Sequence, residues 1–497
     1  VEANLAKQMF QGKMMSADTN AHFSLNGMMD FSQDPYFMDF AADFKHVNLL
    51  KLNILDQPIF FSTKVDLNIT GKNLDDFQGD ASFSGTYLSN TKKRIFLDTL
   101  KIVTERLEGE RYLNLFSDVF DINADGNFSY TQLANDLPRL YKEYMLVLEN
   151  KKEKVDDYYR TTSSYASADY RLNFSLLLKK ANPVISLFAQ ENIKVADNTK
   201  LSGTFSKQDN ITSFNLMGEC HKLQFGNAIL SDSRFNYTSS KNLSHPFVDG
   251  SGSFFSNKQQ VGNDLKTENL ALELIWNNEQ IMFHASAAQK NNDNYLNLDG
   301  SLGLFEGKKD FLFHNIDLKL FKTTWSGDSS RLVFSKNKIL IPNFSLKNEE
   351  QLLVATGAIS QNAEDELNLE LRHFTLKPLS AALGKDLEGI VNGKFMFSDL
   401  MSKNFKLDFD GSVQNVKLDG LLIGNISGGM EWEPEDERFD VRYVLKRDTI
   451  PSMYLSGYIK PFDNNRLALN AHLDKFNLQS FEPFVKDYFS KINGDCT

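Results

Sequence analysis

The sequence predicts a mostly antiparallel β protein that is elongated and carries one amphipathic helical insertion near residues 130–158. Three observations predict this fold class: strict alternation of apolar and polar residues in many short segments, polar turns between those segments, and a repeated β-rich unit without linkers. The 497 residues are enough for a large apolar core, and a hydrophobic content of 41% excludes a disordered chain.

Alternation is the commonest local pattern, and it places every second side chain on the same face of a strand. The first clear run consists of Val65, Leu67 and Ile69. Runs of the same kind follow at Phe83 to Tyr87, at Leu296 to Leu304, at Leu367 with Leu369 and Leu371, at Phe405 with Leu407 and Phe409, and at Leu467 with Leu469 and Leu473. Short polar turns such as residues 361–365 separate them, as expected for antiparallel strands.

One segment has the period of a helix. From Tyr130 to about Tyr158, apolar residues recur at three- and four-residue steps, and Lys and Glu fill the opposite face. The apolar positions are Leu133, Leu137, Leu140, Tyr144, Val147 and Leu148. Pro138 lies inside the segment, so we expect a kink there or two shorter helices. Shorter helical pieces are also expected at 376–383 and 478–489.

A longer repeat is present as well. The stretch from Gly357 to Gly389 aligns with the stretch from Gly457 to Gly494, a period of roughly 100 residues. Its centre is apolar at positions 1, 4, 6 and 9, and this short pattern begins at Phe44, Phe313, Leu371, Val413 and Leu473. The short pattern alone is expected several times by chance, so the extended alignment is the stronger observation.

A repeat of this kind predicts stacked units and an elongated assembly, because each unit buries its apolar face on its neighbour. No Pro- or Ser-rich linker interrupts the chain. We therefore divide the sequence only into a β-rich segment at 1–128, a helical insertion at 129–160 and a repeated β segment at 161–497.

Charge and cysteine content exclude several classes of protein. The chain has 54 Lys and Arg against 65 Asp and Glu, so no basic surface is expected for nucleic acid. Two cysteines, Cys220 and Cys496, exclude a disulfide framework and a cysteine zinc cluster.

No apolar run reaches the roughly 18 residues of a membrane-spanning helix, and no signal peptide opens the chain. Because Val1 is not Met, we expect an excerpt whose signal or anchor lies outside it.

The sharpest local motif contains Asp121, Asn123 and Asp125, which match the opening of a calcium-binding EF-hand loop. Its twelfth position is Gln132, which lacks the bidentate carboxylate that closes the shell of the ion. We therefore expect a strand, a polar turn and a helix that starts near Ser129, without a structural metal.

No other motif predicts catalysis or a cofactor. The eight histidines form neither His-x-His nor His-Glu-x-x-His. Gly424, Gly428 and Gly429 are typical of turns, and the acidic groups at 364–366 and 433–437 fall in predicted turns rather than in a cleft. We expect neither enzyme activity nor a bound cofactor.

Several segments carry a family resemblance. They are Trp325-Ser-Gly, Lys338-Ile-Leu-Ile-Pro-Asn-Phe-Ser-Leu, Leu353-Val-Ala-Thr-Gly-Ala-Ile, Phe374-Thr-Leu-Lys-Pro-Leu, Gly428-Gly-Met-Glu-Trp and Phe476-Asn-Leu-Gln-Ser-Phe-Glu-Pro. Together with the repeat and the alternation, they resemble the TamB proteins of the AsmA-like superfamily of Gram-negative bacteria. The resemblance is best over residues 170–494.

The resemblance implies a long curled sheet, open along one side as a β-taco groove with an apolar inner face. Members are anchored in the inner membrane, cross the periplasm and meet an outer-membrane barrel of the Omp85 type. The family has no catalytic residues. Two roles are implied: transport of phospholipid between the two membranes in outer-membrane biogenesis, or assistance to the assembly of outer-membrane proteins with the barrel partner.

The residues favour the first role independently, because a sheet with so many apolar faces has more apolar surface than one helix can cover. An acyl chain is a suitable partner, since each buried CH₂ contributes about 0.8 kcal/mol. We predict that the groove is lined by Val65, Leu67, Ile69, Leu367, Leu369, Leu371, Phe405, Leu407, Phe409, Leu467, Leu469 and Leu473. Two alternatives stay open: a chaperone groove that accepts an unfolded strand, and a closed β-helix with a dry core.

Overall fold

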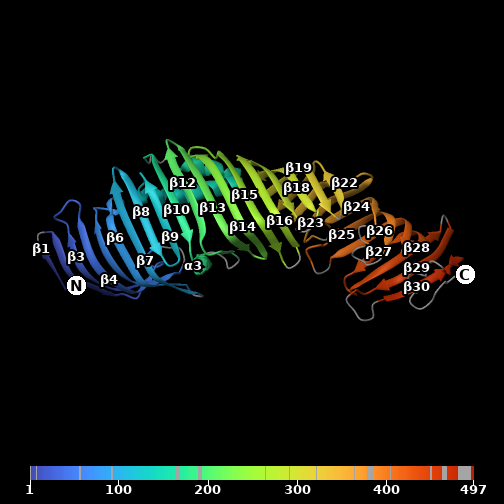
Figure 1. The fold of residues 1–497 in the computed structure, drawn as a ribbon, viewed down its shortest axis with the longest axis horizontal. Coiled ribbons are helices and arrows are strands. Elements are labelled where there is room, and N and C mark those ends of the chain that lie inside the picture. Colours follow the sequence, from blue (N-terminus) through green and yellow to red (C-terminus); the bar gives the residue numbers. More distant parts are fainter. Residues whose placement is uncertain are drawn as a thin grey trace. The chain divides into compact units, whose positions relative to one another are not determined.

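The computed structural model describes residues 2–6, 8–54, 58–90, 93–162, 168–188, 193–262, 265–289, 292–320, 322–362, 364–377, 380, 386–402, 405–447, 450–461, 467–478 and 494–496. These residues divide into two compact units. Unit 1 is Val1–Ile281 with Ala287–Lys290, and unit 2 is Met282–Ser286 with Asn291–Thr497. Both are built mainly of antiparallel strands, so the predicted fold class is confirmed (Figure 1).

The strands of unit 1 follow one another in chain order through the sheet, except that β10 pairs with β12 and β11 with β13. They are β1 (Glu2–Ala6), β2 (Met9–Ala17), β3 (Ala21–Asp30), β4 (Phe37–Asn48), β5 (Phe60–Thr70), β6 (Gln78–Ser89), β7 (Arg94–Leu107), β8 (Glu110–Ser117), β9 (Phe120–Gly126), β10 (Tyr170–Leu178), β11 (Ile193–Val195), β12 (Thr199–Gln208), β13 (Ile211–Phe225), β14 (Ala228–Asn242), β15 (Val248–Val261) and β16 (Leu265–Asn277). The helices are η1 (Leu74–Asp76), α1 (Tyr130–Glu149), α2 (Lys152–Thr161) and α3 (Asn182–Phe188). Strand β17 (Gln280–Ala288) contains residues of both units.

Unit 2 is also a meander, in which β20 and β21 share the edge of β19. Its strands are β18 (Tyr295–Phe305), β19 (Lys308–Leu320), β20 (Thr323–Gly327), β21 (Ser330–Ser335), β22 (Lys338–Asn348), β23 (Gln351–Ser360), β24 (Glu366–Thr375), β25 (Leu387–Ser398), β26 (Lys406–Leu418), β27 (Leu421–Glu433), β28 (Arg438–Arg447), β29 (Ile450–Ile459), β30 (Leu467–Leu473), β31 (Phe476–Asn477) and β32 (Asp495–Cys496).

The short repeated apolar pattern corresponds to β-bulges. The pairing register shifts between its first and fourth positions at Phe44/Val47, Leu371/Phe374 and Val413/Val416. At each shift, three residues on one strand correspond to two on its partner, and this one extra residue keeps both apolar positions on one face of the sheet and bends the strand. At the third position, His373 and Asn415 adopt left-handed backbone with φ of 51° and 52°. The sheet is therefore curled by features that the sequence encodes locally.

The alignment of the two longer repeat copies is confirmed by matching contacts. Gly357 pairs with Leu367 and Gly457 with Leu469, while the amide of Leu376 donates to the carbonyl of Gly389 at 2.9 Å and that of Leu478 to Gly494 at 2.8 Å. At Gly357, which has φ +117°, an added Cβ would lie 2.0 Å from the carbonyl oxygen of Glu366. The first glycine of each copy is therefore required by close approach of the next strand.

The helical insertion consists of two helices, which is one of the two forms expected from the sequence. Ser129 caps α1 by accepting a hydrogen bond of 3.1 Å from the amide of Gln132, which confirms the predicted helix start. The break lies at Asn150, where the backbone is left-handed, and not at Pro138. Pro138 is exposed, so the carbonyl that it leaves without an intrahelical donor faces water. Helix α3 was not expected, and most of 376–383 and 478–489 lies outside the described residues.

Candidate functional site

One face of the unit 1 sheet carries a continuous row of apolar residues, one from each strand from β2 to β16 except β11. Cross-strand pairing joins its members in order: Gly12, Gly27, Phe40, Leu67, Ala81, Ile102, Leu115, Ile122, Leu176, Leu201, Gly218, Phe235, Phe254 and Leu272. We call this set the unit 1 row. Val65 and Ile69 lie on the same face, two residues to either side of Leu67, and both are buried.

Unit 2 has a row of the same kind. Pairing joins Phe344, Ala355, Leu369, Phe395, Phe409, Met430, Val441, Gly457 and Leu469, which we call the unit 2 row. The other residues that the sequence predicted here lie on the same face: Leu367 pairs with Phe397, which pairs with Leu407, and Leu473 pairs with Met453. Phe405 stacks on Trp432 with ring centroids 5.7 Å apart.

Glycines beside the unit 2 row let aromatic rings lie flat on the sheet. A Cβ at Gly393 would lie 2.5 Å from the Phe409 ring, and one at Gly411 would lie 2.6 Å from the same ring. The Phe409 ring also packs on Phe395, with centroids 4.5 Å apart. The face is consequently a broad apolar floor rather than a set of separate pockets.

The opposite face of unit 2 is polar. On this face, cross-strand pairing joins residues that are each one position away from a member of the unit 2 row: Glu370, Lys394, Asp410, Gly429, Arg442, Ser456 and Asn470. Acidic and basic side chains alternate across the first three of these strands. Arg372 donates to Glu370 at 2.8 Å on this side and holds the pKa of that carboxyl below its ordinary value. The two faces of one sheet therefore differ sharply in polarity, as the alternation in the sequence predicts.

The apolar face of unit 2 is open. Leu367, Leu369 and Leu371 are only half-buried, and Leu467 is 63% exposed. All helices whose bounds the described residues define lie in unit 1. No described helix covers these leucines, and their half-exposed side chains leave apolar surface on this face.

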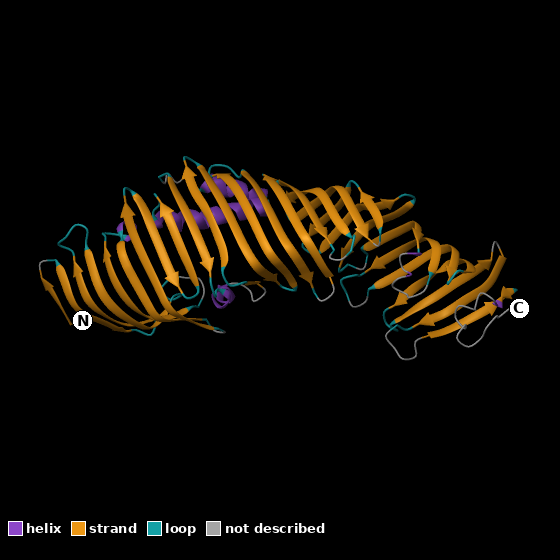
Figure 2. Cartoon of the chain, in the orientation of Figure 1, coloured by secondary structure: helices purple, strands orange, loops and turns teal. Residues whose placement is uncertain are grey.

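The apolar face of unit 1 is partly covered by α1, which Figure 2 shows lying with α2 across the strands. Leu140 and Phe128 pack with Phe205 and with the partly buried Phe214, on the flank of the unit 1 row. The ring of Tyr144 meets Trp276 edge-on. Members of the unit 1 row over the same strands, such as Leu201 and Phe235, stay half-buried beside the helix. This cover was not predicted.

A buried charge cluster lies under α1, and sequence analysis also missed it. Glu143 Oε2 lies 3.4 Å from Lys241 Nζ, and both side chains are fully buried. Arg139 Nε donates to Glu143 Oε1 at 2.9 Å, and the Tyr158 hydroxyl donates to the same oxygen at 3.1 Å. Burial lowers the pKa of Lys241 to about 8. The available signal was Glu143 itself, a charge three residues after Leu140 inside the apolar stripe of the predicted helix.

A second carboxylate of α1 is buried two helical turns earlier. Asp136 accepts a hydrogen bond of 2.9 Å from the Tyr170 hydroxyl, and its side chain is buried. Tyr170 pairs with Lys207 of β12, a lysine that is 2% exposed. Lys207 pairs with Thr212, and Thr212 in turn with Lys241, so the two buried lysines lie in one cross-strand row.

The EF-hand-like residues are placed in strand β9 rather than in a loop. Asp121 Oδ1 accepts from Lys179 Nζ at 2.7 Å, and Asp125 Oδ2 accepts from the side-chain amide of Asn173 at 2.7 Å. Asn123 donates to Ser175 Oγ at 3.4 Å. Among the described residues, no group of three or more His, Cys, Asp and Glu side chains is arranged to hold a metal ion.

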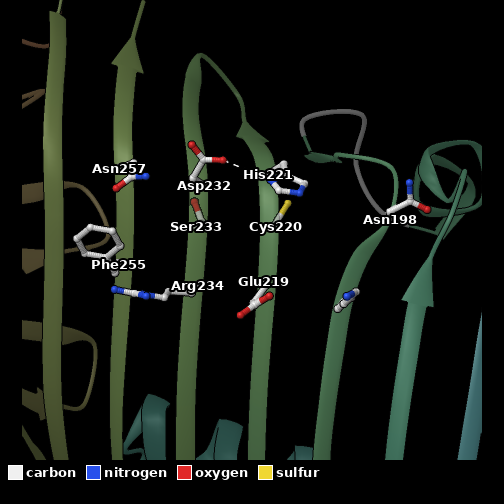
Figure 3. Close-up of a pocket in the computed structure, with 10 residues that line it drawn as sticks. Asn198, Glu219, Cys220, His221, Asp232, Ser233, Arg234, Phe255 and Asn257 are labelled. Atoms are coloured by element: carbon white, nitrogen blue, oxygen red, sulfur yellow. Dashed lines mark hydrogen bonds and ion pairs between the residues drawn. The ribbon is translucent and has the colours of Figure 1, made fainter.

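Figure 3 shows a shallow depression on the polar side of β12 to β15. His221 Nδ1 lies 3.3 Å from Asp232 Oδ1, and the imidazole is 84% exposed. The neighbouring Cys220 sulfur accepts a bond of 3.2 Å from Thr199 Oγ1 and donates one of 3.1 Å to the Lys222 carbonyl. Because the cysteine is bonded to these groups rather than to the imidazole, the depression does not present a paired nucleophile and base.

Comparison with models of protein families, with curated proteins and with solved structures finds no match to this chain. Within the described residues, none of the helices is both long and apolar enough to cross a membrane. The two apolar rows are therefore the features of this chain from which a function can be inferred.

Proposed function

We propose that this chain carries phospholipid along its apolar sheet face, as part of a bridge between two membranes. The unit 1 row and the unit 2 row would hold the acyl chains, while the headgroup stays at the rim in water. Transfer of a 16-carbon acyl chain from water to an apolar surface is favourable by roughly 10 kcal/mol. A continuous apolar row therefore removes most of the free-energy barrier to moving the lipid. The observation that carries this proposal is the unbroken unit 2 row, whose members other than Val441 are only half-buried.

Two features support lipid over the alternatives. A dry core needs side chains buried at crystal-like density, whereas Leu369 is half-buried and Leu467 is mostly exposed. A strand-binding chaperone needs an unpaired sheet edge, and β24 to β29 are hydrogen-bonded on both sides. Acyl chains need no backbone partner, so an open face is sufficient for them.

The resemblance to TamB proteins supplies the proposed setting. In this setting, the chain acts in the periplasm of a Gram-negative bacterium. Its inner-membrane anchor lies outside the present sequence, and its partner at the outer membrane is an Omp85-type barrel. Assistance to outer-membrane protein assembly is the runner-up role. A passive conduit of this kind needs neither a catalytic residue nor a cofactor.

The test is site-specific photocrosslinking in cells, with a photoreactive residue at Leu369 and a matched position at Glu370 on the opposite face. Mass analysis of the adducts should show phospholipid at Leu369 and none above background at Glu370. Protein adducts at Leu369 in place of lipid would favour the assembly role. Equal labelling of the two faces would contradict any function that depends on the apolar row.

A further inference from the structure

The helices α1 and α2 form an insertion that the sheet does not need for its own pairing. Strand β9 pairs directly with β10 on either side of the insertion, from Gly126 opposite Leu172 to Phe120 opposite Leu178. The chain leaves the sheet after Gly126 and returns to the adjacent strand. The helices can therefore separate from the face without breaking a strand ladder.

Helix α1 covers lysine side chains as well as an apolar surface. Phe205 and Phe214 belong to the same face as the unit 1 row, and they lie next to the rim row that contains Lys207 and Lys241. With α1 in place, Glu143 lies against Lys241, and Asp136 is bonded to Tyr170, the pairing partner of Lys207. An apolar floor beside two rim lysines matches the chemistry of an anionic phospholipid, with acyl chains on the rings and phosphate at the ammonium groups.

Burying charge is an inefficient way to attach a helix. The desolvation of two ions commonly offsets their attraction, so apolar residues in place of Glu143 and Lys241 would hold α1 at least as well. Glu143 is best explained by Lys241, because that lysine would otherwise be buried without a counter-charge. Asp136 and Glu143 are seven residues apart, which is about two helical turns, so both lie on the same side of α1.

We propose that α1 is an internal occupant of an anionic-phospholipid site, in which Glu143 takes the place of a headgroup phosphate at Lys241 and Asp136 occupies the neighbouring position beside Tyr170. The inference rests on the proposed function and specifies how it is regulated in unit 1. With the helix docked, acyl chains have only the unit 1 row. With the helix lifted, the face widens to include Phe205, and the lysines bind the headgroup.

The experiment uses the full chain with a photoreactive residue at Phe214, beneath α1, and phosphatidylglycerol or phosphatidylcholine vesicles as the lipid source. Ser213 on the opposite face gives the background, and Leu369 reports on the proposed function in the same samples. In the double variant Asp136→Asn/Glu143→Gln, Lys241 loses its carboxylate partner, which should favour the lifted helix. We expect the phosphatidylglycerol adduct at Phe214 to rise more than about tenfold, with no change at Leu369.

Adding Lys207→Gln and Lys241→Gln to the double variant tests the headgroup role. The preference for phosphatidylglycerol over phosphatidylcholine at Phe214 should disappear, while some adduct persists. A preference that survives these changes would overturn the assignment of the lysines.

A deletion of residues 129–168, closed by a short turn, removes α1 without relying on charge. Far-ultraviolet circular dichroism establishes that each variant keeps the sheet. If Phe214 stays at the Ser213 background in both the double variant and the deletion while Leu369 yields lipid, α1 is a permanent part of the core and the inference is wrong. If Leu369 yields no lipid in any sample, the proposed function fails, and this inference fails with it.

Discussion

The ring of Tyr144 meets the indole of Trp276 edge to face, with centroids 5.8 Å apart. The Tyr144 hydroxyl also shares a hydrogen bond of 2.6 Å with Ser239 Oγ. Since Tyr144 belongs to α1 and Trp276 to β16, emission from Trp276 reports whether the helix is docked on the sheet.

The stability of the α1 contact should peak near pH 10. Burial raises the pKa of Tyr144 to about 12, so the contribution of its neutral phenol is complete below about pH 10 and is lost as the pH rises toward 12. Burial lowers the pKa of Lys241 from 10.5 to about 8, so its contribution is present above about pH 10.5 and is lost as the pH falls through 8. The charged and titratable groups that face Lys241 are Glu143, Arg139 and Tyr159.

Urea midpoints from Trp276 emission, with Trp325→Phe and Trp432→Phe in the background, measure this profile. In Lys241→Met, the increase between about pH 8 and 10 should disappear and the decrease above pH 10 should remain. A midpoint independent of pH in the parent protein would contradict the assignment of both groups.

A charge placed in the unit 2 row should block the proposed passage of lipid. In Leu369→Arg, the guanidinium lies in the apolar path. Acyl chains can pass it only if they are exposed to water or if the charge is desolvated, and both cost free energy. Transfer of fluorescent phospholipid between vesicles should fall more than about tenfold. Asn368→Arg, one residue away on the polar face, should transfer lipid like the parent. Equal loss in both variants would show that the effect is not specific to the apolar face.

The close strand approach at Gly357 predicts a large loss of stability on substitution. In Gly357→Ala the new Cβ would meet the Glu366 carbonyl at 2.0 Å, and we expect about 3 kcal/mol of destabilisation or more. Gly420 also has positive φ, at +80°, but an added Cβ there meets nothing within 4 Å. Gly420→Ala should therefore cost only about 1 kcal/mol. Urea unfolding followed by Trp432 emission compares the two, and similar losses would refute the steric explanation.

Calcium should not stabilise unit 1 through β9. Asp121 already neutralises Lys179, and Asp125 is held by Asn173, so an ion would have to displace both contacts. We expect the thermal midpoint to be the same in calcium and in chelator, and Asp121→Ala to lower it in both. Micromolar calcium binding by calorimetry that is lost in Asp121→Ala would reverse this conclusion.

The faces of the strands could be predicted from the sequence because the two-residue period leaves little choice. Once Leu367, Leu369 and Leu371 alternate with polar residues, their shared face is determined. The cross-strand pairing of Leu369 with Phe395 adds only the identity of the neighbour. The bulges appear in the sequence as the recurring apolar pattern. The sequence alone does not explain why the first two apolar positions of that pattern are three residues apart.

The cover on unit 1 could not be predicted in the same way. Periodicity showed that α1 has an apolar stripe, but the strands that it contacts follow from tertiary packing, and Trp276 is far from Tyr144 in the sequence. The helix break was misplaced because Pro138 is a stronger sequence signal than Asn150. An exposed proline is tolerated, whereas a left-handed asparagine ends the helix.

The chain-order pairing of the strands has a consequence for how the protein folds. In unit 1, from β1 to β9, each strand is hydrogen-bonded to the one just before it. Contacts between neighbouring hairpins are short in sequence separation, so little loop-closure entropy opposes them and folding is expected to be fast for a β protein. The sheet can grow from one end as the chain is synthesised, and each completed strand offers its edge as the template for the next.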